Sequence, residues 1–154
     1  MPVNYYHIDH TGLEVVEPLW NELVDHHGNI SRNMNHPFSR ITFHERSKEL
    51  LSKVEHGQLQ IILAIDDTTN KHIGYCISSI TKKGEAEIDS IYVSEDYRSN
   101  GIGASLINQS IEWIENQKAE SISISVIYGN ERAIRFYEKY GFYLRSYILK
   151  NRMR

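Results

Sequence analysis

The sequence predicts an α+β fold, in which helices flank a mixed sheet that begins as an antiparallel meander and continues through a parallel crossover. Three observations predict it. Three strand-like runs between residues 60 and 93 are separated by two tight polar turns, as in a meander. A glycine-bearing loop and an amphipathic helix follow the third run. A further strand-like run comes next, and a helix between two strands makes them parallel neighbours.

The composition is that of an ordinary globular protein. The 154 residues suggest one domain, over residues 1–154. The formal net charge of −3 argues against a nucleic-acid partner, because nucleic-acid-binding faces are usually basic. No apolar run approaches the roughly 20 residues that cross a bilayer, and the first ten residues lack the features of a signal peptide. We therefore expect a cytoplasmic protein without a membrane partner. Cys76 is the only cysteine and the histidines are scattered, so neither a disulfide nor a metal site is expected.

The first elements are predicted from spacing and capping signals. Residues 3–8 resemble a strand, and apolar residues recur at helical spacing from residue 13 to residue 27. Thr42 and Glu45 form a capping-box signature that opens a second helix, which should end near Gly57.

The three runs of the meander cover residues 60–65, 73–80 and 85–93. The first is continuously apolar, which indicates burial on both faces. In the third, strict alternation places Glu87, Asp89 and Ile91 on one face of the sheet.

The crossover helix carries Ile107, Ile111 and Ile114 on one face. The run after it, residues 121–126, alternates isoleucine or valine with serine, which is typical of a strand with one apolar face. It should lie parallel to the run over residues 85–93.

The last helix should begin at Asn130, a good N-cap, and end at Gly141, which suits a left-handed C-terminal cap. Residues 142–150 resemble a final strand. Only a dozen residues follow Phe142, too few for a closing hairpin, so a single strand, or one supplied by a partner subunit, would close the sheet. The sequence is therefore compatible with a homodimer.

The loop over residues 98–103 is the most informative motif. A glycine loop at the start of a helix collects backbone N–H groups without partners, and the helix dipole adds positive potential, so the loop predicts an anion site. A P-loop is excluded because no Gly-Lys-Ser/Thr is present, and a dinucleotide fingerprint because Leu106 replaces the third glycine. Gly101 and Gly103 taken alone could equally mark a tight turn.

Two motifs in register resemble the GCN5-related N-acetyltransferase (GNAT) superfamily. One is Arg-x-x-Gly-x-Gly at residues 98–103, preceded by AEIDSIYV, and the other is NERAIRFYEKYGF at residues 130–142. The resemblance covers residues 85–142. It implies the acyl-CoA N-acyltransferase (GNAT) fold and an N-acetyltransferase. Such an enzyme transfers acetyl from acetyl-CoA to a primary amine of a small molecule, peptide or protein, by direct attack in a ternary complex and without a metal.

The resemblance also implies how the co-substrate is held. Loop amides would grip the diphosphate, and pantetheine would pair with the backbone of the preceding strand where it separates from the next. Asn130 either contacts pantetheine or only caps its helix. The matching residues are Ile91, Tyr92, Val93, Arg98, Ser99, Asn100, Gly101, Ile102, Gly103, Ala104 and Asn130.

The catalytic residues implied by the resemblance are Tyr137 and Glu87. Tyr137 would return a proton to the departing thiolate, or else be a packed aromatic residue. Glu87 would take the proton of the amine, whose pKa is near ~10.4, or else be an exposed strand carboxylate. Asp89 competes with Glu87 for the role of base.

The acceptor site should lie near residues 26–43, where Asp25, His26, His27, Arg32 and His36 are polar candidates that could equally be surface residues. The alternative function is an acyl-CoA-binding regulatory module without catalysis. The presence of both Glu87 and Tyr137 favours the enzyme.

Overall fold

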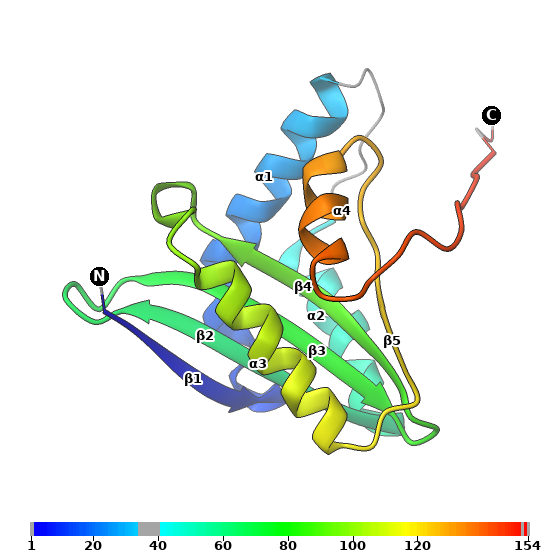
Figure 1. The fold of residues 1–154 in the computed structure, drawn as a ribbon, viewed down its shortest axis with the longest axis horizontal. Coiled ribbons are helices and arrows are strands. Elements are labelled where there is room, and N and C mark those ends of the chain that lie inside the picture. The colour runs from blue at the N-terminus through cyan, green and yellow to red at the C-terminus, as the bar shows by residue number, and fades with distance from the viewer. Residues whose placement is uncertain (1, 34–40, 152, 154) are drawn as a thin grey trace.

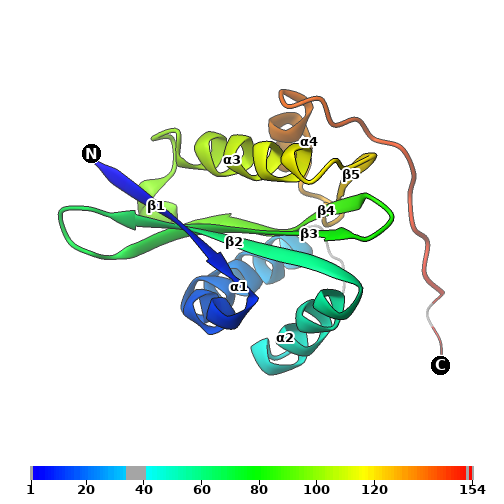
Figure 2. The same cartoon turned by 90° about the horizontal axis from the view of Figure 1, so that it is seen from below.

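One five-stranded sheet, in the order β1-β2-β3-β4-β5, lies between two layers of helices. The structure is a computed structural model and describes residues 2–33, 41–151 and 153. Helices α1 and α2 cover one face of the sheet, and α3 and α4 cover the other (Figures 1 and 2). His36 lies outside the described residues.

Up to residue 138 the strands and helices lie close to where the sequence predicts them, although the first α-helix begins and ends later than predicted. The strands are β1 (Val3–Asp9), β2 (Gly57–Asp66), β3 (His72–Thr81), β4 (Glu85–Val93) and β5 (Ser121–Ile124). The α-helices are α1 (Glu17–Asn33), α2 (Phe43–Ser52), α3 (Ile102–Asn116) and α4 (Glu131–Glu138). Short 3₁₀ helices are η1 (His10–Val16), η2 (Lys53–His56) and η3 (Glu95–Tyr97).

The pairing of the strands confirms the predicted α+β class. Neighbouring strands from β1 to β4 are antiparallel, and β4 and β5 are parallel. The crossover between β4 and β5 contains α3, which packs on one face of the sheet (Figure 2). The glycine loop between β4 and α3 therefore lies at the carboxyl end of β4.

The core fills both faces of the sheet. Tyr75 and Ile77 of β3 pack towards α1 and α2, and Cys76 and Ile80 of the same strand pack towards α3 and α4. In β2, residues 61–64 are all buried, as the continuous apolar run predicts. The sheet is thus the shared layer that positions the helices on its two sides.

The predicted capping box opens α2. The Glu45 backbone N–H donates to the Thr42 hydroxyl at 3.1 Å, and the Thr42 backbone N–H donates to the Glu45 carboxylate at 3.3 Å. These two bonds satisfy amide donors that have no partner inside the helix. α2 then leads directly into η2, which ends beside β2, and this carries Lys53 to the sheet.

Strand β4 contains a β-bulge that the sequence does not signal. Ser90 pairs with Ile77 and Ile88 pairs with Ser78, so Asp89 is an extra residue in the β3–β4 ladder. The predicted alternation is therefore wrong beyond Asp89. Glu87 and Asp89 face α2, where they contact Lys53, whereas Ile91 packs with the core on the α3 side.

Lys53 of η2 holds both carboxylates of this stretch. Its ammonium lies 3.0 Å from a carboxylate oxygen of Glu87 and forms a shorter contact with Asp89. The Asp89 side chain is fully buried, and its Oδ2 has no hydrogen-bond partner among the described residues. Burial raises the pKa of Asp89, and hydrogen bonds with Lys53 oppose the rise. Burial also acts to lower the pKa of Lys53, but Asp89 and Glu87 outweigh it and raise that pKa.

The predicted last strand is absent. Residues 142–150 form no strand and run free of the sheet. The predicted helix end is confirmed, because Gly141 has φ +91° and the Phe142 amide donates to the Tyr137 carbonyl at 3.3 Å. The end of α4 is therefore as predicted, but the residues that follow it do not pair with any strand of the described chain.

We expect Lys53→Met to destabilise the protein in a pH-dependent way. Loss of the ammonium leaves the Asp89 carboxylate buried without a cation. A fully buried pair broken in this way costs roughly 3–5 kcal/mol, and because Lys53 is 33% exposed we expect about 1–2 kcal/mol at pH 7. Without Lys53 the folded-state pKa of Asp89 rises further above its value in the unfolded chain. The loss in free energy of unfolding relative to wild type should therefore become smaller as the pH falls towards 4.

Urea denaturation at pH 7 and pH 5 measures this effect. The double variant Lys53→Met/Asp89→Asn should recover most of the loss, because no charge is then buried. Lys48→Met, at an exposed position of α2, is the matched control and should be neutral. A deficit that does not change with pH and is not relieved by Asp89→Asn would show that Lys53 acts only through packing.

Candidate active site

Strands β4 and β5 are paired over only four residues each and separate beyond them. The last pair is Ile88 with Ile124. β4 continues to Val93, whereas β5 ends, two residues short of its predicted end. The split begins at the bulge, because Asp89 is the residue that follows the last pair. From there on, no described strand pairs with the outer edge of β4.

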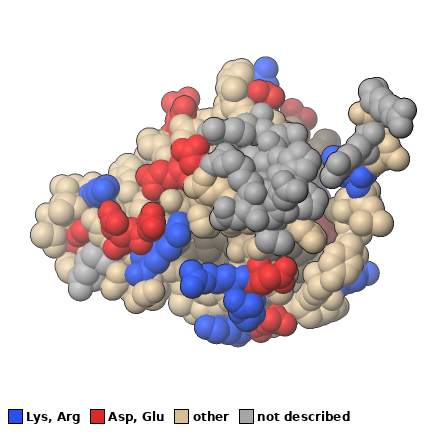
Figure 3. Space-filling model, turned by 90° about the horizontal axis from the view of Figure 1, so that it is seen from above, with Lys and Arg blue, Asp and Glu red and all other residues tan. Residues whose placement is uncertain are grey.

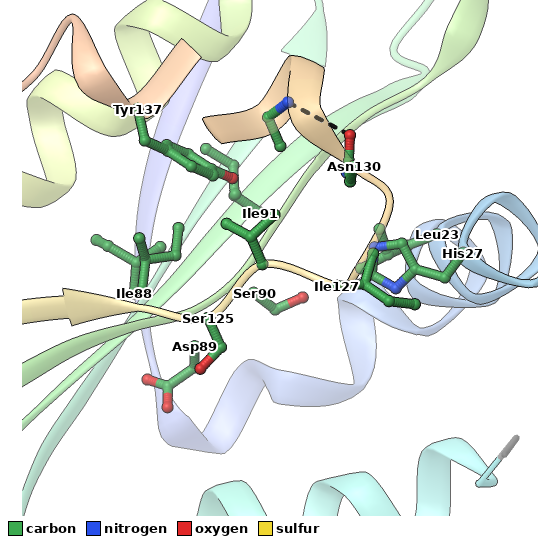
Figure 4. A pocket seen from close by; sticks show the side chains of 13 residues that line it. Leu23, His27, Ile88, Asp89, Ser90, Ile91, Ser125, Ile127, Asn130 and Tyr137 are labelled. Carbon is green, nitrogen blue, oxygen red and sulfur yellow. Dashed lines mark hydrogen bonds between the residues drawn. The ribbon is translucent and has the colours of Figure 1, made fainter. Parts of the chain in front are cut away.

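A cleft of about 90 Å³ lies in this split. Its walls come from β4, from the chain that continues β5, from α1 and from α4 (Figure 4). On the same scale a single water molecule needs about 10–15 Å³, so the cleft has room for a small chemical group. The lining residues are Leu23, His27, Ile88, Asp89, Ser90, Ile91, Ile124, Ser125, Val126, Ile127, Asn130, Ala133 and Tyr137.

Tyr137 enters the cleft from α4, with its hydroxyl directed towards Ile91 (Figure 4). Its ring also packs edge-on against Phe136 and Phe142. Burial raises the pKa of the Tyr137 phenol above its ordinary value of 10.0. The phenol is therefore protonated at neutral pH and can donate a proton inside the cleft.

Asn130 and His27 line the opposite end of the cleft from Ile88 (Figure 4). The Asn130 side chain accepts a hydrogen bond from the Ala133 amide at 3.3 Å, so it caps α4 as predicted while it also borders the cleft. Burial lowers the pKa of the His27 imidazole, and His26 lowers it further. His27 is thus neutral at pH 7. Of the other acceptor candidates, Asp25 is exposed and His26 is half-buried.

The loop between β4 and α3 presents a series of open backbone amides. The Arg98 amide donates to the Glu95 carbonyl at 3.3 Å, but no amide from Ser99 to Ala104 donates to any described group of the protein. Ser99 and Gly101 both have positive φ, at +67° and +77°. Alternation of left- and right-handed residues turns successive N–H groups to one side, an arrangement typical of backbone sites that bind anions.

The two glycines of the loop have different roles. Gly101 needs the left-handed conformation, and a Cβ there would meet nothing within 4 Å. Gly103 has an ordinary φ, and a Cβ there would touch the Phe136 ring at 3.5 Å, which is a normal contact. The protein itself therefore does not require glycine at Gly103, whereas a ligand that approaches the backbone closely would.

Side chains around the loop anchor it to the sheet. The Arg98 guanidinium donates from Nε to the Val93 carbonyl at 3.0 Å and lies over the Tyr92 ring. The Tyr92 hydroxyl and the Ser94 hydroxyl both donate to one carboxylate oxygen of Glu22, at 3.2 and 3.0 Å. Tyr92 therefore faces α1 and holds that helix against β4, away from the cleft.

Of the two predicted catalytic residues, Tyr137 lies in the cleft and Glu87 lies beside it. Glu87 precedes the bulge, is not among the lining residues and has a side chain 40% exposed. Asp89 lines the cleft but is completely buried. Sequence reasoning did not identify Lys53, which joins the two carboxylates from η2, because no local motif marks it.

Three further observations concern the surface charges, the helices and the metal-ligating side chains of the described chain. Basic and acidic side chains are intermingled on the face seen in Figure 3, outside the atoms drawn in grey. Among the described residues, none of the helices is both long enough and apolar enough to cross a bilayer. No group of three or more histidine, cysteine or acidic side chains within the same residues is arranged to hold a metal ion.

The chain is similar to known acetyltransferases. It is 41% identical over 66 residues to an uncharacterized N-acetyltransferase of Methanocaldococcus jannaschii, a match that covers 43% of this chain and only 29% of that protein. Among solved structures, a putative acetyl transferase from Pyrococcus furiosus has 25% identity and a TM-score of 0.65, with 97% of this chain and 100% of that one covered.

The fold is also that of the aminoglycoside N-acetyltransferase AAC(6′)-Iy, solved in complex with CoA. The TM-score is 0.66 at 18% identity, over 98% of this chain and 99% of that one. The model of the acetyltransferase (GNAT) family matches residues 20–142, which is most of the chain. The chain therefore belongs to the acetyltransferase (GNAT) family, which confirms the resemblance, the fold and the acyltransferase class predicted from the sequence.

Proposed function

We propose that this protein is an N-acetyltransferase that transfers the acetyl group of acetyl-CoA to a primary amine by direct attack. One observation carries the proposal: the split between β4 and β5 holds a cleft with Tyr137 in it, at the same end of the sheet as the loop of open amides. A thioester tail laid in the split would reach the phenol while its diphosphate lies on the loop.

The co-substrate would be held mostly by backbone groups. The amides of residues 98–104 would bind the diphosphate, with Arg98 also fixing the loop through Val93. Pantetheine amides would pair with the free edge of β4 at Ile91, Tyr92 and Val93, as an added strand does. Asn130, at the start of α4, would lie beside the pantetheine arm. The CoA complex of the similar aminoglycoside acetyltransferase supports this assignment of the co-substrate.

The volume of the cleft supports the proposal that only the thioester end of acetyl-CoA enters it. About 90 Å³ suits an acetyl thioester and its attacking amine, and the nucleotide would lie outside on the loop. Tyr137 would protonate the departing thiolate, since its phenol lies in the cleft and its raised pKa keeps it protonated at neutral pH. Attack by the amine forms the C–N bond as the C–S bond breaks, so no enzyme thioester is needed.

We propose Glu87 as the group that takes the proton of the amine, through a water at the bulge. Glu87 is more exposed than Asp89 and keeps a second carboxylate oxygen that does not contact Lys53. Asp89 holds Lys53 in place from the buried side. The two carboxylates and one ammonium leave a local excess of negative charge, which would favour a cationic acceptor.

The acceptor would enter between α1 and the bulge, past His27. We keep the acceptor class as predicted, a primary amine of a small molecule, peptide or protein. A homodimer also stays a proposal, supported by the outer edge of β5, which has no partner strand in the described chain. A cytoplasmic location and the lack of a nucleic-acid or membrane partner stay proposals too, supported by the composition and charge of the chain.

Tyr137→Phe should lower kcat by about 10²-fold or more, because general-acid catalysis contributes roughly that much. The measurement is thiol release from acetyl-CoA with a panel of primary amines. CoA binding should stay within about twofold of wild type. Tyr140→Phe is the matched control, since Tyr140 lies on the next turn and packs against Phe136. Tight CoA binding without turnover of any amine would instead favour the acyl-CoA-binding regulatory module.

Glu87→Gln should lower kcat/KM by about 10²-fold at pH 7, and the loss should shrink as the pH approaches the amine pKa near ~10.4. At high pH the amine is already neutral and needs no base. A pH–rate profile measures this, with Glu85→Gln on the same strand as control. A loss that is constant across pH would assign Glu87 the role of holding Lys53.

Gly103→Ala should weaken CoA binding by tenfold or more without lowering the stability of the fold. The added methyl group meets Phe136 at ordinary distance but lies where the diphosphate would approach the backbone. Calorimetry with CoA measures the loss, and Asn108→Ala, exposed on α3, is the control. Inhibition by pantetheine, which lacks the diphosphate, should not change. An equal loss of affinity for CoA and for pantetheine would show that the diphosphate does not bind to this loop.

A further inference from the structure

Helix α4 and its C-cap carry three basic side chains that the proposed transfer does not use. We define Arg132, Arg135 and Lys139 as the basic row. All three residues are exposed, and none of their side chains forms an ion pair or a hydrogen bond with a described residue. Solvated helix faces often carry charges, so the place of the row on the helix decides what it can do.

The side chains of α4 meet different parts of the molecule around the helix. Tyr137 lies in the cleft (Figure 4), and Phe136 lies against Gly103 of the glycine loop. Since a helix turns by about 100° per residue, the basic row lies about 40–100° from Phe136, on the side away from Tyr137. Around α4 the order is therefore cleft, loop, basic row.

The acidic residues of α4 do not neutralise this row. By the same geometry Glu131 and Glu138 point about 140–160° from Phe136, away from the loop. They stand four residues before and three residues after Arg135, which is the spacing of helical ion pairs. No such ion pair forms within the described structure. The cations therefore lie beside the loop, and the acids lie on the far side of the helix.

Arg132 stands where a helix does not favour a cation. It is the second residue of α4, in the turn that carries the positive end of the helix dipole. Arg135 lies one turn further on, so the two guanidinium groups also repel each other. A bound anion would offset both unfavourable interactions, because it would accept hydrogen bonds from both groups.

We propose that the basic row binds the 3′-phosphate of CoA, with Arg132 and Arg135 as its main ligands. The inference rests on the proposed function, since it takes the diphosphate to lie on the loop. In CoA the ribose that carries the 3′-phosphate is joined to the diphosphate on the side away from pantetheine. The order of groups along the ligand, which is thioester, diphosphate and 3′-phosphate, then matches the order cleft, loop and basic row around α4.

The chemistry of the row suits a phosphate monoester. Such a group carries about −1.5 to −2 charges at pH 7 and three oxygens that accept hydrogen bonds. A guanidinium group can donate two parallel hydrogen bonds to it, and Lys139 would add a third positive charge. The row is exposed, so its contribution to affinity should fall as the salt concentration rises. The protein would thereby distinguish CoA from dephospho-CoA, which lacks only the 3′-phosphate.

Calorimetry with CoA and dephospho-CoA is the first test. Wild type should bind CoA about tenfold or more tightly, as expected for one or two charge-assisted hydrogen bonds. Arg132→Gln/Arg135→Gln should lower the affinity for CoA to that for dephospho-CoA. Its affinity for dephospho-CoA should stay within about twofold of wild type, because that ligand offers the two arginines no phosphate. Unchanged binding of dephospho-CoA also shows that the variant is folded.

The matched control is Lys82→Gln/Lys83→Gln. It removes two exposed cations from the turn before β4, at the opposite end of that strand from the loop, and should change neither affinity. Equal affinity of wild type for the two ligands, or an equal loss of both in the arginine variant, would overturn the inference but not the proposed function. Binding of neither ligand would overturn both. Selective binding of CoA without turnover of any amine would support the phosphate site and contradict acetyl transfer.

The second test separates the 3′-phosphate of CoA from phosphate in general. Adenosine 3′,5′-bisphosphate should compete with CoA for wild type about tenfold more strongly than adenosine 5′-phosphate does. The two nucleotides should compete equally for Arg132→Gln/Arg135→Gln. Inorganic phosphate that competes as strongly as the bisphosphate would show that the row is a general anion surface, and would overturn the inference.

Discussion

The separation of β4 from β5 beyond Ile88 is the constraint on which the rest of the site depends. The bulge at Asp89 breaks the regular pleat at the same place where the parallel pairing stops. Lys53 holds this irregular stretch by its contacts with Glu87 and Asp89. A buried carboxylate without a cation destabilises the folded state. The cation that compensates Asp89 is Lys53 of η2, which precedes β2 in the chain. Helix α2 is therefore part of the support of the split.

Helix α4 joins the split to the loop. Phe136 lies against Gly103, and its neighbour Tyr137 enters the cleft. Consecutive residues on a helix point about 100° apart, so one short helix can face both features. Asn130 caps the same helix and borders the cleft. A ligand that spans the loop and the cleft would thus lie along one short helix.

Local patterns predict most of the fold and less of the site. The bounds of β4, the capping box at Thr42 and the left-handed Gly141 follow from spacing and residue type. The bulge could not be predicted, because neither glycine nor proline marks it and Asp89 fits the regular alternation. Lys53 has no motif, since its partners lie more than 30 residues away. The predicted strand over residues 142–150 is wrong for another reason. A strand forms only beside a neighbouring strand, and the pattern of residues within one segment does not show whether such a neighbour exists.

The same constraint acts on β5, the strand that leads into one wall of the cleft. β5 has a small-residue face of serines, and its isoleucines are only partly buried, so its side chains contribute little to holding it in place. Its position rests on four backbone pairs with β4, and those pairs end where the cleft begins. In the transfer proposed above, those four pairs would have to hold the wall steady enough to keep Tyr137 and a thioester in register.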